Sequence, residues 1–220
     1  MKYLLLFFVC IVSETLCAVE CQMLLSEKEQ KEILAYRRYP PSTKLRLSVA
    51  AVKAGYSAIN KKEYDRAIEE FNRAWRFNQK NIDAYWGAAI VYGTMSEQAK
   101  TVSEAKTLIE KSLRLFKLAE TMLSGKIVEE ENWKLDYAAS LYVAGKILFK
   151  SEKTAAEKYF QEAEKIWLSL KNRRDMKKER DIKVYYRTVW HLTKLYRDWG
   201  RNDLYKKYLK HLPPQIRKTL

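Results

Sequence analysis

The sequence predicts an all-helical protein, and three observations indicate this. Hydrophobic residues make up 47% of the 220-residue chain and charged residues 31%, with only 6 Gly and 4 Pro, a composition typical of a globular helical protein. The prolines occur as Pro40-Pro41 and Pro213-Pro214, so none interrupts residues 42–212. Apolar residues there recur at spacings of three and four, the period of an amphipathic helix. The expected helices span residues 22–38, 43–60, 64–78, 82–98, 103–124, 130–150, 152–171, 180–199 and 202–212.

Residues 1–18 have the pattern of a secretory signal peptide. Lys2 precedes an apolar run from Tyr3 to Val12, and a more polar stretch ends at Ala18, where we expect cleavage. An apolar run of this length is too short to span a bilayer as a helix. The sequence therefore predicts an exported protein, periplasmic or secreted. An uncleaved N-terminal run that keeps the protein associated with a membrane is the alternative.

All three cysteines lie near the N-terminus, at Cys10, Cys17 and Cys21. No disulfide can therefore cross-link the body of the fold, whose core depends on packing alone. Only Cys21 would remain after cleavage, and the sequence leaves open whether it is lipidated, paired or free.

Residues 19–41 are expected to form an N-terminal helix and linker, residues 42–212 the helical domain, and residues 213–220 a C-terminal tail. Ser42, Asn81 and Ser103 stand where side-chain oxygens can cap the helices that follow. Gly200 fits a helix end, since glycine adopts the left-handed conformation without a steric penalty.

The helices repeat in pairs. Gly55, Tyr64, Ala67, Phe71 and Ala74 form one series of small and bulky residues, and Ala89, Ala105, Ile109 and Ser112 form a second series further along the chain. Ala144, Ala156, Phe160 and Ala163 form a third, and Leu192, Tyr196, Gly200, Tyr205 and Leu209 a degenerate fourth. Small residues let two helices of a pair approach closely, and bulky residues fill the space between neighbouring pairs.

The interval from Gly55 to Ala89 gives a period of about 34, which with this pattern resembles the tetratricopeptide repeat (TPR). The segment Lys62-Glu63-Tyr64-Asp65-Arg66-Ala67-Ile68-Glu69-Glu70-Phe71-Asn72-Arg73-Ala74-Trp75 is similar to the turn and second helix of the family consensus. Two departures are Gln79, where the family usually has proline, and a longer spacer around residues 113–132. The resemblance implies a helical-hairpin solenoid of about four TPR-like repeats, with the additional N-terminal helix before them.

The resemblance also implies a concave groove, lined by the first helix of each pair, that binds a protein or peptide partner. The residues placed toward the groove are Val52, Tyr56, Ile59, Trp86, Ile90, Thr94, Leu141, Leu148 and Phe149. This lining is mostly apolar and suits a hydrophobic peptide or an amphipathic helix. A second interpretation is that the N-terminal helix of the same chain covers these side chains, and an oligomer is also compatible with the sequence.

No set of residues indicates catalysis, a cofactor or a metal site. The two histidines, His191 and His211, have no matching cysteine or second ligand nearby in the sequence, and no phosphate-binding, metalloprotease or hydrolase motif is present. We therefore expect a protein that is not an enzyme.

Basic residues are concentrated near the C-terminus. Residues 171–220 hold 16 Lys and Arg against 5 Asp and Glu, which accounts for +11 of the net charge of +15. The densest basic surface predicted is Arg173, Arg174, Lys177, Lys178, Arg180, Lys183 and Arg187. Basic residues beside aromatic ones can bind nucleic acid, but export would separate the protein from that ligand, so an anionic envelope surface suits this region better.

The sequence thus predicts a non-enzymatic adaptor or scaffold that binds a protein or peptide partner, as part of a cell-envelope assembly. The alternative is a membrane-tethered or cytoplasmic module that binds an anionic polymer (acidic lipid, polysaccharide or nucleic acid) through the basic C-terminal third.

Overall fold

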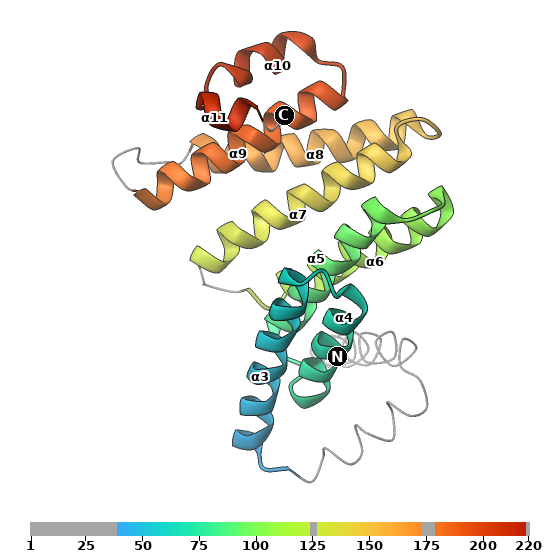
Figure 1. Cartoon of the computed structure of the whole chain (residues 1–220), viewed down its shortest axis with the longest axis vertical. Coiled ribbons are helices and arrows are strands. Elements are labelled where there is room, and N and C mark those ends of the chain that lie inside the picture. The colour runs from blue at the N-terminus through green and yellow to red at the C-terminus, as the bar shows by residue number, and fades with distance from the viewer. Residues whose placement is uncertain (1–38, 124–126, 173–178, 219–220) are drawn as a thin grey trace, which may run out of the picture.

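The computed structural model describes residues 39–123, 127–172 and 179–218, and over this part of the chain every regular element is a helix. The elements, numbered as in Figure 1, are α3 (Pro41–Asn60), α4 (Tyr64–Phe77), α5 (Ile82–Gln98), α6 (Val102–Glu120), α7 (Ile127–Leu148), α8 (Lys153–Asn172), α9 (Glu179–Asp198), α10 (Asn202–Leu209) and α11 (Pro214–Arg217). The all-helical prediction is confirmed. The predicted signal peptide, the helix at 22–38 and the three cysteines lie outside the described residues.

The helix ends confirm some of the predicted caps and correct others. Asn81 caps α5 as expected, because its side chain accepts a hydrogen bond from the backbone N–H of Asp83. Thr101 caps α6 in the same way, so Ser103 lies inside that helix. The prediction for Ser42 was also wrong, because α3 begins one residue earlier at Pro41, whose missing N–H is tolerated in a first turn. Gly200 ends α9 with φ of +78°, as predicted.

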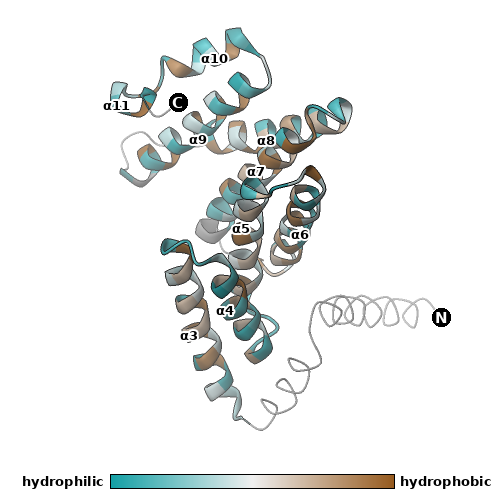
Figure 2. Ribbon diagram, turned by 45° about the vertical axis from the view of Figure 1, so that its right-hand side comes forward, coloured by the Kyte–Doolittle hydropathy of each residue, from teal (hydrophilic) through white to brown (hydrophobic). Residues whose placement is uncertain are grey.

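Consecutive helices pack as hairpins: α3 with α4, α5 with α6, α7 with α8, and α9 with α10. Each hairpin also contacts the next, through α4 and α5, α6 and α7, and α8 and α9. Figure 1 shows the hairpins following one another along the long axis, from α3 (blue) to α10 (red). Figure 2 shows hydrophobic and hydrophilic residues interspersed along each helix, as expected where one face is buried.

Phe71 of α4 shows how bulky and small residues nest. Its ring is 1% exposed and lies between Gly55 of α3 and Gly87 of α5. A Cβ atom at Gly55 would lie 2.8 Å from the Phe71 ring, and one at Gly87 only 2.2 Å away. Phe160 of α8 lies against Gly145 of α7 in the same manner. Glycine is needed at these positions because the neighbouring aromatic ring fills the space of a side chain.

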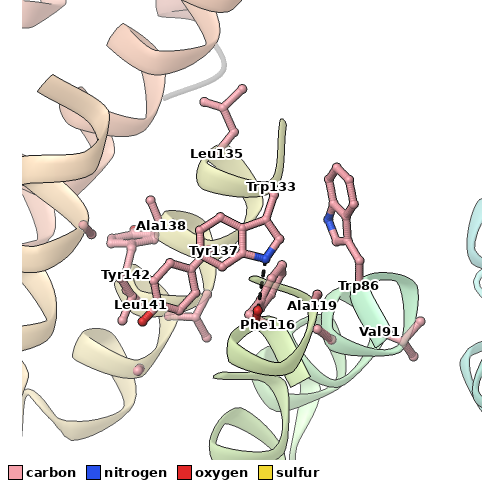
Figure 3. Packing of buried hydrophobic residues seen from close by; sticks show 14 of the residues in the cluster. Trp86, Val91, Phe116, Ala119, Trp133, Leu135, Tyr137, Ala138, Leu141 and Tyr142 are labelled. Atoms are coloured by element: carbon pink, nitrogen blue, oxygen red, sulfur yellow. Dashed lines mark hydrogen bonds between the residues drawn. The ribbon is translucent and has the colours of Figure 1, made fainter. Parts of the chain in front are cut away.

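The junction between the second and third hairpins depends on Trp133 of α7. Its indole is 2% exposed, stacks on Tyr137 with ring centres 4.9 Å apart, and donates a hydrogen bond to the backbone oxygen of Phe116 (3.1 Å). Figure 3 shows this N–H directed at α6. This aromatic cluster occupies the region that the sequence marks as a longer spacer.

Side-chain hydrogen bonds hold the turn from α4 to α5, where the sequence departs from the TPR pattern at Gln79. Tyr85 donates its hydroxyl hydrogen to the backbone oxygen of Gln79 (3.0 Å), and Trp75 donates its indole N–H to the Tyr85 oxygen (2.5 Å). Both aromatic residues are buried. Side-chain hydrogen bonds therefore fix the turn at Gln79.

Candidate docking surface

The first helices of successive hairpins lie next to one another, because α5 contacts both α3 and α7, and α7 contacts α9. Side chains from these four helices share one surface, which we call the first-helix face. Pockets, hydrogen bonds and ion pairs link most of its residues, and Lys194 is linked by its electrostatic interaction with Lys146 and Glu97. The residues of this face are Leu45, Val49, Val52, Lys53, Ile82, Asp83, Trp86, Ile90, Thr94, Glu97, Asp136, Ser140, Val143, Lys146, Arg187 and Lys194.

A pocket of about 540 Å³ lies at the α3 end of this face. Its apolar lining residues, which we call its walls, are Leu45, Val49 and Val52 of α3, Ile82 and Trp86 of α5, and Leu123 after α6. Its polar and charged lining residues, which we call its rim, are Lys53, Asn78, Lys80, Asn81 and Asp83. We call it the α3–α5 pocket. Leu45 is 55% exposed and Val49 44%, although both are apolar. They lie one helical turn apart, so they form one open stripe on α3.

A smaller pocket of about 120 Å³ lies between α5 and α7. Ile90, Gly93, Thr94 and Glu97 line it from α5, and Asp136, Ala139, Ser140 and Val143 from α7. Apolar, hydroxyl-bearing and acidic side chains are therefore mixed in this pocket, whereas the α3–α5 pocket has apolar walls and a charged rim.

The structure brings part of the predicted groove together. Val52 and Trp86 line the α3–α5 pocket, and Ile90 and Thr94 line the smaller one. Tyr56 is half-buried with its ring 5.3 Å from that of Phe71, and Ile59 is half-buried against the core.

The predicted groove residues of the third hairpin, Leu141, Leu148 and Phe149, line neither of these two pockets. Leu141 is 1% exposed, so it belongs to the core and cannot line an open groove. The neighbouring residue Ser140 lines the pocket instead, because successive residues on a helix point about 100° apart. Leu148 is half-buried, as is Phe149, whose ring lies 5.8 Å from that of Phe160.

Of the six apolar residues that line the α3–α5 pocket, sequence reasoning missed four: Leu45, Val49, Ile82 and Leu123. A signal for the first two was present, since Leu45, Val49, Val52 and Tyr56 recur at spacings of three and four along one helix. Leu123 follows the end of α6 and is far from α3 in sequence, so only the fold places it in this pocket.

Asp136 of α7 links three first helices. Trp86 of α5 donates its indole N–H to Asp136 Oδ2 (3.1 Å), and Arg187 of α9 pairs with Oδ1 (2.7 Å). Burial raises the pKa of the Asp136 carboxyl group, although the Arg187 charge and the two hydrogen bonds act in the opposite direction. The pKa of Tyr56 is also raised, first by burial and then by the charges of Asp83 and Asp136.

A second polar group lies between α5, α7 and α9. Lys146 pairs with Glu97 (3.3 Å), and the ammonium of Lys194 lies 4.6 Å from the centre of the Trp190 ring. Burial and the positive charge of Lys146 lower the pKa of Lys194. Tyr142 donates its hydroxyl hydrogen to the carboxylate of Asp198. The first-helix face therefore mixes polar and apolar side chains from α5 to α9, and its most exposed aliphatic side chains, Leu45 and Val49, lie at the α3–α5 pocket.

The predicted basic surface is only partly described. Arg173, Arg174, Lys177 and Lys178 lie outside the described residues, as does the side chain of Arg180. Lys183 pairs with Glu179 (2.7 Å), and Arg187 pairs with Asp136. Several aromatic residues near this run pack in the core: Tyr196 is 1% exposed, and Trp199 and Tyr208 are each 9% exposed. These rings are not available for stacking on nucleotide bases.

His191 of α9 lies in an aromatic stack. Its ring centre is 4.8 Å from that of Trp167, with the planes 16° apart. Burial lowers its pKa to about 3, and the charges of Arg187 and Lys194 contribute to the shift. His211 is exposed after the end of α10. Among the described residues, no group of three or more His, Cys, Asp or Glu is close enough together to hold a metal ion.

Comparison with known protein families and with curated proteins gives no match to this chain. Within the part of the chain that the structure describes, no helix has the length and apolar character required to cross a bilayer.

Proposed function

We propose that this protein is a non-enzymatic, TPR-like scaffold that binds a segment of another polypeptide on its first-helix face. The α3–α5 pocket is the observation that supports this proposal most directly. Leu45 and Val49 remain about half exposed at the edge of a pocket with apolar walls. Apolar side chains that gather around one concave site are typical of a surface that a partner covers.

The arrangement of the helices supports the same function. Hairpins packed in series give a long surface to which every first helix contributes, and such surfaces bind extended or helical segments. The signal-peptide pattern at the N-terminus favours export, so the partner is expected among proteins of the cell envelope or the extracellular space. Binding a polymer through the basic C-terminal third is less well supported, because Lys183 and Arg187 already pair with carboxylates.

Photo-crosslinking in the cells that make this protein tests the proposal. A photoreactive phenylalanine derivative replaces Val49 in the full chain, and the matched control places it at Lys158, an exposed position on α8. We expect a polypeptide adduct from position 49 that is absent from position 158. Adding Leu45→Glu should remove the adduct, whereas Val102→Glu, at an apolar residue 58% exposed on α6, should not. Equal labelling at both positions, or an adduct unaffected by Leu45→Glu, would contradict the proposal.

A further inference from the structure

The α3–α5 pocket combines an apolar interior with two basic residues on its rim. Lys53 lies on α3, one helical turn after Val49, and Lys80 lies in the turn before α5. Both lysines are exposed. The turn is ordered, since the backbone N–H of Lys80 donates to the side-chain oxygen of Asn78 (3.1 Å), and Asn81 caps α5. The two lysines thus come from two different elements, α3 and the turn before α5, that line the same pocket.

These lysines differ from Arg187 and Lys146, two other basic residues of the first-helix face. Arg187 pairs with Asp136, and Lys146 pairs with Glu97. Within the described part of the chain, neither Lys53 nor Lys80 has a carboxylate partner for its side chain. Among the residues that the structure describes, these two positive charges on the rim therefore have no carboxylate partner.

Asp83, the one acidic residue on the rim, offsets only one of the two positive charges. It lies in the first turn of α5, where the positive end of the helix dipole favours a carboxylate. Its negative charge acts on Tyr56, whose pKa it helps to raise. Asp83 thus interacts with the N-terminus of α5 and with Tyr56, while the lysines extend from the rim into solvent.

The shape of the pocket indicates what kind of segment fits it. Leu45 and Val49 are one helical turn apart and face Ile82 and Trp86 across the pocket. A volume of about 540 Å³ is within the range of roughly 300–1,000 Å³ typical of binding pockets. Two walls provided by two helices suit an amphipathic segment that inserts apolar side chains from one stripe, as in helix-in-groove recognition.

We infer that the partner segment bound at the α3–α5 pocket is amphipathic and acidic: its apolar side chains enter the pocket, and its carboxylates meet Lys53 and Lys80. This inference rests on the proposed function and adds the chemistry of the partner. Complementary charges on the rim of an apolar site select the partner and increase the rate of association. Salt weakens such exposed charge pairs and leaves burial of the apolar stripe largely unchanged.

Three synthetic peptides, each long enough for about five helical turns, test the inference on the full-length protein. Each has leucines at helical spacing on one face, and the flanking positions are all Glu, all Gln or all Lys. Fluorescence anisotropy of the labelled peptides gives the Kd at low and high salt. We expect the Glu peptide to bind about tenfold more tightly than the Lys peptide at low salt, with a smaller difference at high salt.

Charge-reversal variants test whether Lys53 and Lys80 cause the preference for the Glu peptide. The double variant Lys53→Glu/Lys80→Glu should reverse the preference, so that the Lys peptide binds more tightly. The control variant Lys158→Glu/Lys165→Glu changes the net charge equally at exposed positions on α8 and should keep the preference for the Glu peptide. The same response in both variants would overturn the inference, because net charge rather than the rim would then explain the preference.

Two other outcomes separate this inference from the proposed function. If the three peptides bind equally and Leu45→Glu abolishes binding, the acidic partner is refuted while the docking surface stands. If none of the peptides binds and Leu45→Glu lowers the Tm, then the protein's own residues preceding α3 cover the pocket, and both the inference and the proposed function are overturned.

Discussion

Replacing Gly87 with alanine tests the close packing between α4 and α5. A Cβ atom at Gly87 would lie 2.2 Å from both Cε1 and Cζ of Phe71, far inside van der Waals contact. The Phe71 ring is fully buried and has Gly55 beside it on α3, where a Cβ atom would already be 2.8 Å away. The ring therefore has little freedom to move away from an alanine on α5.

The expected loss of stability follows from two opposing effects. In an unhindered helix interior, changing glycine to alanine increases stability by about 1 kcal/mol. Overpacking a core costs about 1–3 kcal/mol, and a contact as short as 2.2 Å indicates the upper end. We therefore expect Gly87→Ala to lower the free energy of unfolding by about 2 kcal/mol. With a denaturant dependence of about 2 kcal/mol per molar urea, the unfolding midpoint should fall by about 1 M.

Urea denaturation followed by circular dichroism in the far ultraviolet measures this change. Phe71→Leu provides a double-mutant cycle, because leucine lacks the outer ring carbons that Gly87→Ala would contact. In that background Gly87→Ala should cost at least about 1 kcal/mol less than in the wild type. An unfolding midpoint that rises in Gly87→Ala would refute the reasoning, since the helix-propensity gain would then outweigh the contact.

Two further predictions concern His191 and Trp133. The pKa of His191 is about 3 in the folded protein and 6.5 in the unfolded chain, so the unfolded state binds the proton first. Its contribution to stability is fully present above about pH 6.5 and is lost as the pH falls toward about 3, which amounts to about 2 kcal/mol between pH 7 and pH 5. Urea denaturation at both pH values should show this loss in the wild type and a smaller one in His191→Phe, and equal losses would contradict it. Trp133→Phe should lower the free energy of unfolding by about 2–3 kcal/mol, because it removes the hydrogen bond to Phe116 and leaves a cavity. Trp199→Phe is the control, since the indole N–H of Trp199 has no hydrogen-bond partner within the described residues, and a larger loss there than at Trp133 would be inconsistent with this explanation.

The helices could be predicted from sequence because their signals are local. Apolar residues at spacings of three and four and the absence of proline from residues 42–212 are enough to place α3 to α10 within a few residues of their ends. The short helix α11 was missed, because so short a helix carries no periodic pattern and the segment was expected to be a tail. The cap predicted at Ser103 was misplaced, since Thr101 is an equally suitable cap nearby.

The candidate site was less predictable because its residues meet only in the folded chain. Asp136 is separated by 50 residues from Trp86 and by 51 from Arg187, and no local pattern indicates that the three side chains bond to one another. The burial of Leu141 depends on the rotation of α7 about its own axis, which packing against its neighbours decides. Leu45 and Val49 carried a local signal, but only their exposed fractions in the folded chain show that the rest of the described chain leaves them open.

The pairing of each helix with the next one along the chain has a consequence for how the protein acquires its structure. Closing a hairpin brings together residues close in sequence, so little chain entropy is lost before stabilising contacts form. Proteins with mostly local contacts fold quickly, and arrays of this kind can nucleate at any unit and propagate outward. A newly made chain can therefore begin to fold at its first complete hairpin, before the remaining residues have been synthesised.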